Sequence, residues 1–213
     1  MKHGPTNTRA LREKKRILTL SLTQKRFLVG TLLGDGCLIL SRSGKAARLQ
    51  IRQNVRYKEF VDWNYHFFKD WVLTQPRYDR YNDSLVFRTL SHVQLGKIRN
   101  MFYVGTKKIV PSNIFDLLTH PLSLAIWFMD DGNGDKRICR LRLSTYAFGI
   151  KGNEKLRRCL LKNFSLETKI IKDSKGSYLY FLEDSAKQLY AMIKPYIIPC
   201  MEYKFVKVAS ITP

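Results

Sequence analysis

The stretch LAIWFMDDGNG, residues 124–134, contains the pattern that decides the fold. An apolar, helix-like run ends in two adjacent carboxylates, Asp130 and Asp131, and then breaks at Gly132. The carbonyl groups at a helix C-terminus already carry partial negative charge, so an acid there is disfavoured by a few tenths of a kcal/mol up to about 1 kcal/mol. The pattern therefore predicts a positively charged partner at this helix end.

A second copy of the pattern lies in the first half of the chain. Aligned by their glycines, LVGTLLGDG (residues 28–36) and LAIWFMDDG (residues 124–132) share the leading Leu, the final Asp-Gly and an apolar middle. Asp131 follows Asp35 by 131 − 35 = 96 residues, and the halves end on similar phrases, KKIVPSN and IIPCMEYK. The chain is thus predicted to be a tandem repeat.

Two facing repeats would bring the ends of these helices together. Small residues at Gly30, Gly34 and Ala125 would let the helix backbones approach closely, with Asp35 beside Asp131 on a pseudo-twofold axis. Like charges a few ångströms apart cannot all persist unneutralised, so we expect bound divalent cations. Mg²⁺ fits best, because it takes one or two carboxylates and completes its shell with water and phosphate oxygens.

The composition indicates a polyanion partner. The 213 residues are 45% hydrophobic, enough for one large domain or two packed halves, and 38 Lys and Arg against 17 Asp and Glu give a net charge of +21. Nucleic acid is the first candidate partner, with a ribosomal-type protein or a merely soluble surface as the plainer alternative.

Four scattered cysteines and four isolated histidines indicate neither a zinc site nor a disulfide framework. No apolar run approaches the length of about 18 residues that a membrane span needs, so we expect no membrane partner.

The predicted elements also occur twice in the same order. We expect a helix from Thr23, which caps it, to Gly36, then a hairpin over 37–53, a helix over 55–73, two strands within 77–90 and a helix over 92–103. After a linker, we expect a helix over 121–132, a strand over 136–145, a helix over 153–164, strands over 168–173 and 177–182, and a helix over 184–196. We assign residues 1–20 to a basic N-terminal arm, or alternatively a transit peptide, 21–118 to the first repeat with its linker, and 119–213 to the second repeat and a C-terminal tail.

The predicted ribbons carry the side chains that read bases. A two-stranded β-ribbon fits the DNA major groove, where Arg pairs with guanine and Gln with adenine. Period-two alternation puts six residues on one face of each ribbon: Arg48, Gln50, Arg52, Arg140, Arg142 and Ser144. Further ribbon cations are expected to extend the contact to phosphates: Arg77, Arg80, Arg88, Lys169 and Lys172. Lys108 and Lys204, at matching places in the two closing phrases, are expected to steady charge on a phosphate or to help deprotonate water.

These motifs resemble the LAGLIDADG homing endonucleases, specifically the single-chain, two-repeat type encoded in organellar introns. The resemblance covers the chain from about Thr23 to Lys204. It implies an α+β fold of two αββαββα repeats whose antiparallel sheets form a saddle over DNA. It also implies a monomer in an organelle that cleaves both strands of double-stranded DNA at a long, nearly asymmetric target with Mg²⁺, for which Mn²⁺ or Ca²⁺ can substitute in binding.

The resemblance also assigns site residues. Asp35 and Asp131 match the metal ligands, Asp130 takes a structural or supporting role, and Gln53 is similar to a polar residue that holds water near the metal. The second half departs from the pattern, because Thr145 and Tyr146 stand where a glutamine is expected. Two alternatives remain on the same scaffold: an intron maturase or RNA-binding protein, and a non-catalytic DNA-binding regulator. Retention of both acids and both lysines favours the nuclease.

Overall fold

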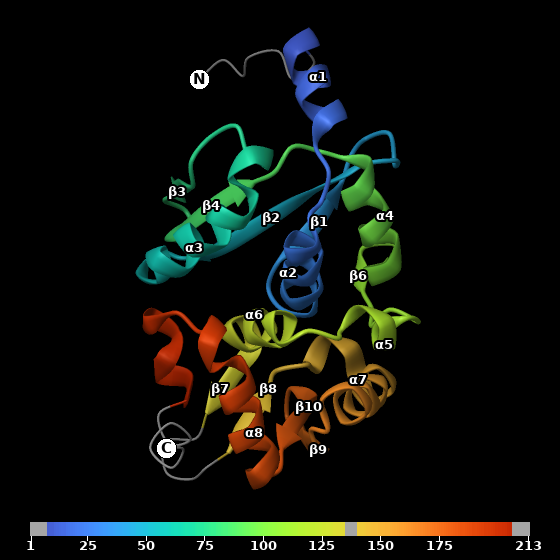
Figure 1. Ribbon diagram of the computed structural model, residues 1–213, viewed down its shortest axis with the longest axis vertical. Helices are drawn as coiled ribbons and strands as arrows, with labels where there is room; N and C mark the ends of the chain where they lie inside the picture. Colours follow the sequence, from blue (N-terminus) through green and yellow to red (C-terminus); the bar gives the residue numbers. More distant parts are fainter. Residues whose placement is uncertain (1–7, 135–139, 206–213) are drawn as a thin grey trace.

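The computed structural model describes residues 8–134 and 140–205 (Figure 1). Residues 1–7 of the expected arm, residues 136–139 of an expected strand and the tail after residue 205 therefore lie outside the described residues. No helix in the described part of the chain is long and apolar enough to cross a membrane.

The first half begins with a separate helix and then runs helix, two strands, helix, two strands, helix. Its elements are α1 (Arg9–Ile17), α2 (Leu22–Leu33), β1 (Cys37–Leu40), β2 (Ala47–Asn54), α3 (Lys58–Phe68), β3 (Arg77–Asp79), β4 (Ser84–Arg88) and α4 (Val93–Phe102). A connection then holds three short elements, β5 (Tyr103–Val104), β6 (Lys107–Lys108) and α5 (Ile114–Leu117).

The second half repeats this order. Its elements are α6 (Pro121–Asp131), β7 (Gly132–Gly134), β8 (Leu141–Leu143), α7 (Gly149–Phe164), β9 (Thr168–Asp173), β10 (Gly176–Phe181) and α8 (Glu183–Ile193), followed by a 3₁₀ segment at Pro199–Phe205. The predicted α+β fold with two αββαββα repeats is confirmed. The helix expected from Asn153 begins earlier, at Gly149, which has a φ of 59° that suits glycine.

The two sheets have the same topology. Their strand orders are β1-β2-β4-β3 and β7-β8-β10-β9, and all the strand pairs in them are antiparallel. Helices α3 and α4 pack on the first sheet and α7 packs on the second, so each sheet has one helix-covered face and one open face. On β2 the buried residues Ala47, Leu49 and Ile51 alternate with half-buried polar ones, as the sequence predicted.

The first motif helix is bounded differently from the prediction. Ser21, not Thr23, is its N-cap, because the Ser21 hydroxyl accepts from the Gln24 backbone while the Gln24 side chain accepts from the Ser21 backbone. This reciprocal capping box satisfies two helix-end donors at once, an arrangement that a cap at Thr23 would lack. The helix also ends at Leu33, with Gly34 rather than Gly36 as its C-cap.

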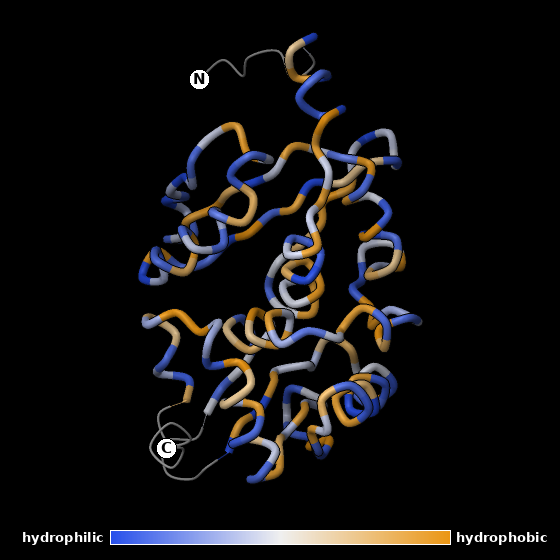
Figure 2. Tube along the Cα trace, viewed as in Figure 1, coloured by the Kyte–Doolittle hydropathy of each residue, from blue (hydrophilic) through white to orange (hydrophobic). Residues whose placement is uncertain are grey.

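Helices α2 and α6 hold the halves together in the centre of the molecule (Figures 1 and 2). A Cβ built on Gly30 would lie 2.4 Å from the Ser123 carbonyl oxygen, and one on Gly34 would lie 2.5 Å from the Asp130 Cβ. The glycines therefore permit close helix contact as predicted, but Gly30 faces Ser123 and Ile126 rather than the expected Ala125. Because Gly30 and Gly34 have no β-carbon, α2 packs closely on α6, and the C-terminal ends of the two helices meet.

Candidate functional site

Both lysines of the closing phrases bind a motif-helix end. Lys108 Nζ donates to the Gly34 carbonyl at 2.5 Å, and Lys204 Nζ donates to the carbonyls of Met129 and Asp130 at 2.5 and 3.0 Å. The ammonium groups satisfy carbonyls that a helix leaves unpaired and oppose its partial negative charge. They are the positive partners that the sequence predicted for these acidic helix ends.

Three carboxylates gather beside these lysines. The charges of Asp35 and Asp131 act on each other, and burial together with the Asp35 charge raises the pKa of Asp131 to about 7. Burial lowers the pKa of Lys108 and Lys204, although the carboxylates oppose this shift. Ionisation of Asp131 is therefore unfavourable in the metal-free site, and a bound cation would favour the ionised carboxylate.

Asp130 is a half-buried carboxylate that links the halves. Its Oδ2 accepts from the Thr31 hydroxyl at 3.1 Å and from the Asp35 backbone N–H at 3.2 Å. Burial and the charges of Asp35 and Asp131 raise its pKa well above the usual range. Asp130 thus fixes the backbone of Asp35, which agrees with the supporting role expected for it.

The two halves differ in how they hold their acids. Gln53 Nε2 donates to Asp35 Oδ2 at 2.8 Å. At the matching place in the second half, Thr145 is buried with its hydroxyl near the Leu143 carbonyl, and the Tyr146 hydroxyl donates to Asp173 at 2.8 Å. Neither residue replaces Gln53, so of Asp35 and Asp131 only Asp35 accepts a hydrogen bond from a side-chain amide within the described residues.

The open face of the first sheet is rich in arginine. The strand register puts Arg48, Gln50 and Arg52 of β2 on this face, together with Arg77 of β3 and Arg88 of β4. Burial and the charges of Arg48, Arg77 and Arg52 lower the pKa of Arg88. Mutual repulsion of this kind favours an anionic ligand on the face. Arg80 lies in the exposed turn beyond it, with its guanidinium 5.2 Å from the Tyr81 ring centre.

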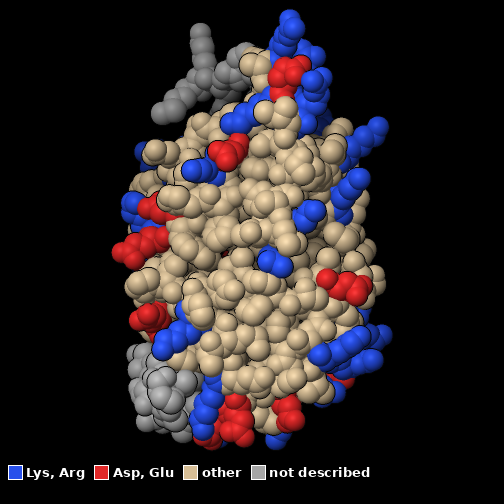
Figure 3. Space-filling view, viewed as in Figure 1, with Lys and Arg blue, Asp and Glu red and all other residues tan. Residues whose placement is uncertain are grey.

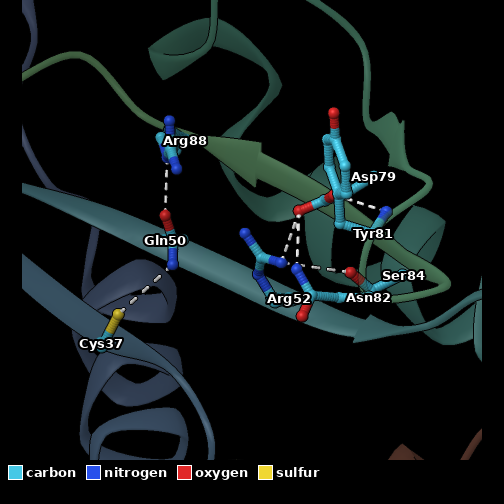
Figure 4. A network of polar contacts seen from close by, with 8 residues as sticks. All are labelled: Cys37, Gln50, Arg52, Asp79, Tyr81, Asn82, Ser84 and Arg88. Carbon is cyan, nitrogen blue, oxygen red and sulfur yellow. Dashed lines mark hydrogen bonds and ion pairs between the residues drawn. The ribbon is translucent and has the colours of Figure 1, made fainter.

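A polar network holds two of these side chains in place (Figure 4). Arg52 Nη1 donates to Asp79 Oδ2 at 2.6 Å and lies 3.4 Å from Ser84 Oγ, while Asn82 donates to the same Asp79 oxygen. Separately, Arg88 Nε donates to Gln50 Oε1 at 2.6 Å. The sequence did not identify Asp79 as a partner, because nothing in its spacing separates it from other turn residues.

Asp35 and the open face of the first sheet line the same groove. An open groove of about 450 Å³ joins the end of the first motif helix to the open face of the first sheet, and is lined by Asp35, Gln50, Arg52, Gln53, Asn54, Asn82 and Ser84. Asp35 therefore opens onto the same groove as the polar side chains of β2.

The open face of the second sheet combines arginine with tyrosine. The guanidinium of Arg142 lies 5.5 Å from the Tyr178 ring centre, and that of Arg140 lies 5.7 Å from the Tyr180 ring centre. A hollow of about 260 Å³ lies here, lined by Asn133, Arg140, Leu141, Arg142, Tyr178 and Tyr180. Sequence reasoning missed these tyrosines, although their alternation with the buried Leu179 and Phe181 is a period-two signal that would have located them.

The structure places three further predicted contact residues of this half in different surroundings. Lys169 pairs with Tyr180 and shares its open face, whereas Lys172 pairs with Ser177. Ser177 lies on the helix side of the strand, where its carbonyl accepts from the Asn153 side chain. Lys172 therefore does not share the open face with Lys169, because counting by two from Lys169 skips it, and its expected phosphate contact stays a prediction. Ser144, beyond the end of β8, is half-buried, and its backbone N–H donates to the Asp131 carbonyl at 3.0 Å.

The sequence model of the LAGLIDADG DNA endonuclease family matches residues 25–189. The chain belongs to this family. It is 28% identical over 189 residues to the cytochrome b mRNA maturase bI2 of Debaryomyces hansenii, covering 83% of this chain and 71% of the relative.

Solved structures extend the likeness. The homing endonuclease I-WcaI bound to its DNA recognition sequence superimposes with a TM-score of 0.85 and 27% identity, covering 95% of this chain and 94% of that one. I-DmoI in complex with DNA and Mn has a TM-score of 0.52 at 16% identity, covering 82% of this chain and 97% of that one, which shows the shared fold alone.

Proposed function

We propose that this chain is a monomeric homing endonuclease that cuts both strands of double-stranded DNA at a long, nearly asymmetric site with a divalent metal ion. The observation that carries the proposal is the meeting of one carboxylate from each half, close enough that Asp35 contributes to raising the pKa of Asp131. A protein that only binds nucleic acid gains nothing from this repulsion, whereas a metal site uses it.

The donor set suits Mg²⁺, with Mn²⁺ as a substitute. Carboxylate oxygens are hard ligands, and no group of three or more His, Cys, Asp or Glu residues in the described chain could hold an ion alone. Asp35 and Asp131 would therefore share the ion with water and with oxygens of the DNA backbone. When bound, the ion polarises the phosphodiester and lowers the pKa of a water molecule that attacks it.

The remaining residues position the reaction. Gln53 and Asp130 orient the side chain and the backbone of Asp35, while Lys108 and Lys204 hold the two helix ends and offset charge that develops on the phosphate. The open faces of the sheets would select the sequence from the major groove. The maturase relative supports an origin in an organellar intron and makes RNA binding the second candidate function.

The test starts with a randomised duplex library incubated with Mg²⁺, followed by sequencing of the cut ends. We expect one long motif with a short, defined stagger. Asp35→Asn and Asp131→Asn should each abolish cleavage while binding to that duplex persists, whereas Asp116→Asn, at an exposed carboxylate on α5, should cleave normally. Cleavage that survives both substitutions would exclude the proposed metal role, and tight binding to intron RNA without any cut duplex would favour the maturase function.

A further inference from the structure

Helix α1 is a basic element that the proposed site does not use. It carries five cations, Arg9, Arg12, Lys14, Lys15 and Arg16, against one acid, Glu13. None of its residues is buried. Figure 3 shows these Lys and Arg side chains gathered at the end of the molecule, whereas the middle of the same face carries few charges.

The outward side of α1 is a stripe of arginines. Arg9, Arg12 and Arg16 are exposed and recur at helical spacing. Arg16 lies 3.8 Å from Glu13, with side chains 81% and 58% exposed, so this ion pair contributes little. Within residues 8–134 and 140–205, no acidic side chain forms an ion pair with Arg9 or Arg12.

The helix is nevertheless held in a fixed place. Thr8 caps its N-terminus, accepting from the Leu11 backbone at 3.2 Å. His92 accepts from the Gln94 backbone through Nδ1, which leaves Nε2 to donate to the Lys15 carbonyl at 3.1 Å. His92 itself pairs with Ala47 at the start of β2. These contacts fix the position of the arginine stripe relative to the first sheet.

The position of α1 decides its partner. The two halves lie one after the other along the longest axis, and α1 extends past the first half (Figure 1). A duplex that covers both open faces would continue past this end. A helix of nine residues is about 14 Å long, which matches about four base pairs.

We infer that α1 binds the phosphate backbone of duplex DNA flanking the target on the side read by the first sheet. The inference rests on the proposed DNA function. It adds a contact outside the sheets that lengthens the bound site and strengthens binding without selecting bases.

The experiment uses the full chain and its cleaved target. A core duplex is extended by ten base pairs on one side or the other, and Kd is measured from 50 to 200 mM salt with Ca²⁺ in place of Mg²⁺. The variant Arg9→Gln/Arg12→Gln/Arg16→Gln removes the stripe with residues of similar helix propensity. The matched control, Lys151→Gln/Arg158→Gln/Lys162→Gln, removes three exposed charges from α7, which covers the helix side of the second sheet.

We expect extension on the first-sheet side to tighten binding by the wild type and the α7 control, but not by the α1 variant. The salt slope of the α1 variant on that duplex should fall by about 2 to 3, one counterion per lost contact. Glu13→Gln should bind the same duplex more tightly. The inference would be overturned if the α1 variant behaved like the wild type on the extended duplex, or if it already lost affinity for the unextended core. Failure of the wild type to cleave any duplex would instead count against the proposed function.

Discussion

Replacing Asp131 by asparagine should stabilise the metal-free protein at neutral pH while it destroys cleavage. The folded protein holds the pKa of this carboxyl at about 7, against 3.8 for an ordinary aspartate. At 1.36 kcal/mol per unit, the ionised side chain costs the fold on the order of 4 kcal/mol above pH 7. The neutral amide introduced by Asp131→Asn carries no such charge and removes this cost.

The sign follows from which state binds more protons. Between pH 3.8 and 7 the folded protein keeps a proton on Asp131 that the unfolded chain has lost. The wild type should therefore lose stability relative to the variant as pH rises from 4 to 8, with almost no difference at pH 4. For a chain of this size, 4 kcal/mol corresponds to a rise in Tm of about 8 to 16 °C at pH 8, taken as an upper value.

The assay is thermal unfolding in EDTA across this pH range, with Asp116→Asn as the control for removing an exposed carboxylate. Added Mg²⁺ should then raise the Tm of the wild type and not that of the Asp131 variant, because only the wild type offers both acids. A variant that is less stable at pH 8, or whose advantage is the same at pH 4, would refute the reasoning.

Three further outcomes are expected. Lys204→Met should abolish cleavage and cost about 1 to 3 kcal/mol in urea unfolding, because two helix-end carbonyls lose their donor; an unchanged unfolding midpoint would contradict this. Arg52→Ala should relax selection at one base position at a cost of about 1 to 3 kcal/mol, whereas Arg80→Ala, in the exposed turn, should weaken binding to all sequences equally; cleavage profiles over a single-substitution target library separate the two. Gly30→Ala should destabilise the chain by about 1 to 3 kcal/mol, because the added methyl group would meet the Ser123 carbonyl at 2.4 Å; a normal Tm would show that the helices can separate without cost.

The two-repeat fold was predictable because the motif acids and the closing lysines each occur twice in the sequence. Lys108 and Lys204 are 204 − 108 = 96 residues apart, the same separation as the motif acids, and both bind helix-end carbonyls. The face of β2 followed from strict alternation of Leu49 and Ile51 with polar residues. Residues were placed correctly from the sequence where the 96-residue repeat or the period-two alternation marked them.

The misses arose where a tertiary contact decides the outcome. Ser21 caps α2 in a reciprocal pair with Gln24, whereas Thr23 is also a favoured cap by residue type. Asp79 reaches Arg52 through the pairing of β3 with β4, which sequence spacing does not encode. The face of Lys172 depends on the register with β10, which the sequence around it does not show.

The Asp130–Gly34 contact has a consequence for anyone who would rebuild this protein. The two positions are equivalent in the repeat, yet one carries a side chain and the other leaves the room for it. A homodimer made from two copies of the second half would force two aspartates into the space that now accommodates one. Hybrid enzymes assembled by exchanging halves must therefore move residues 34 and 130 as a matched pair.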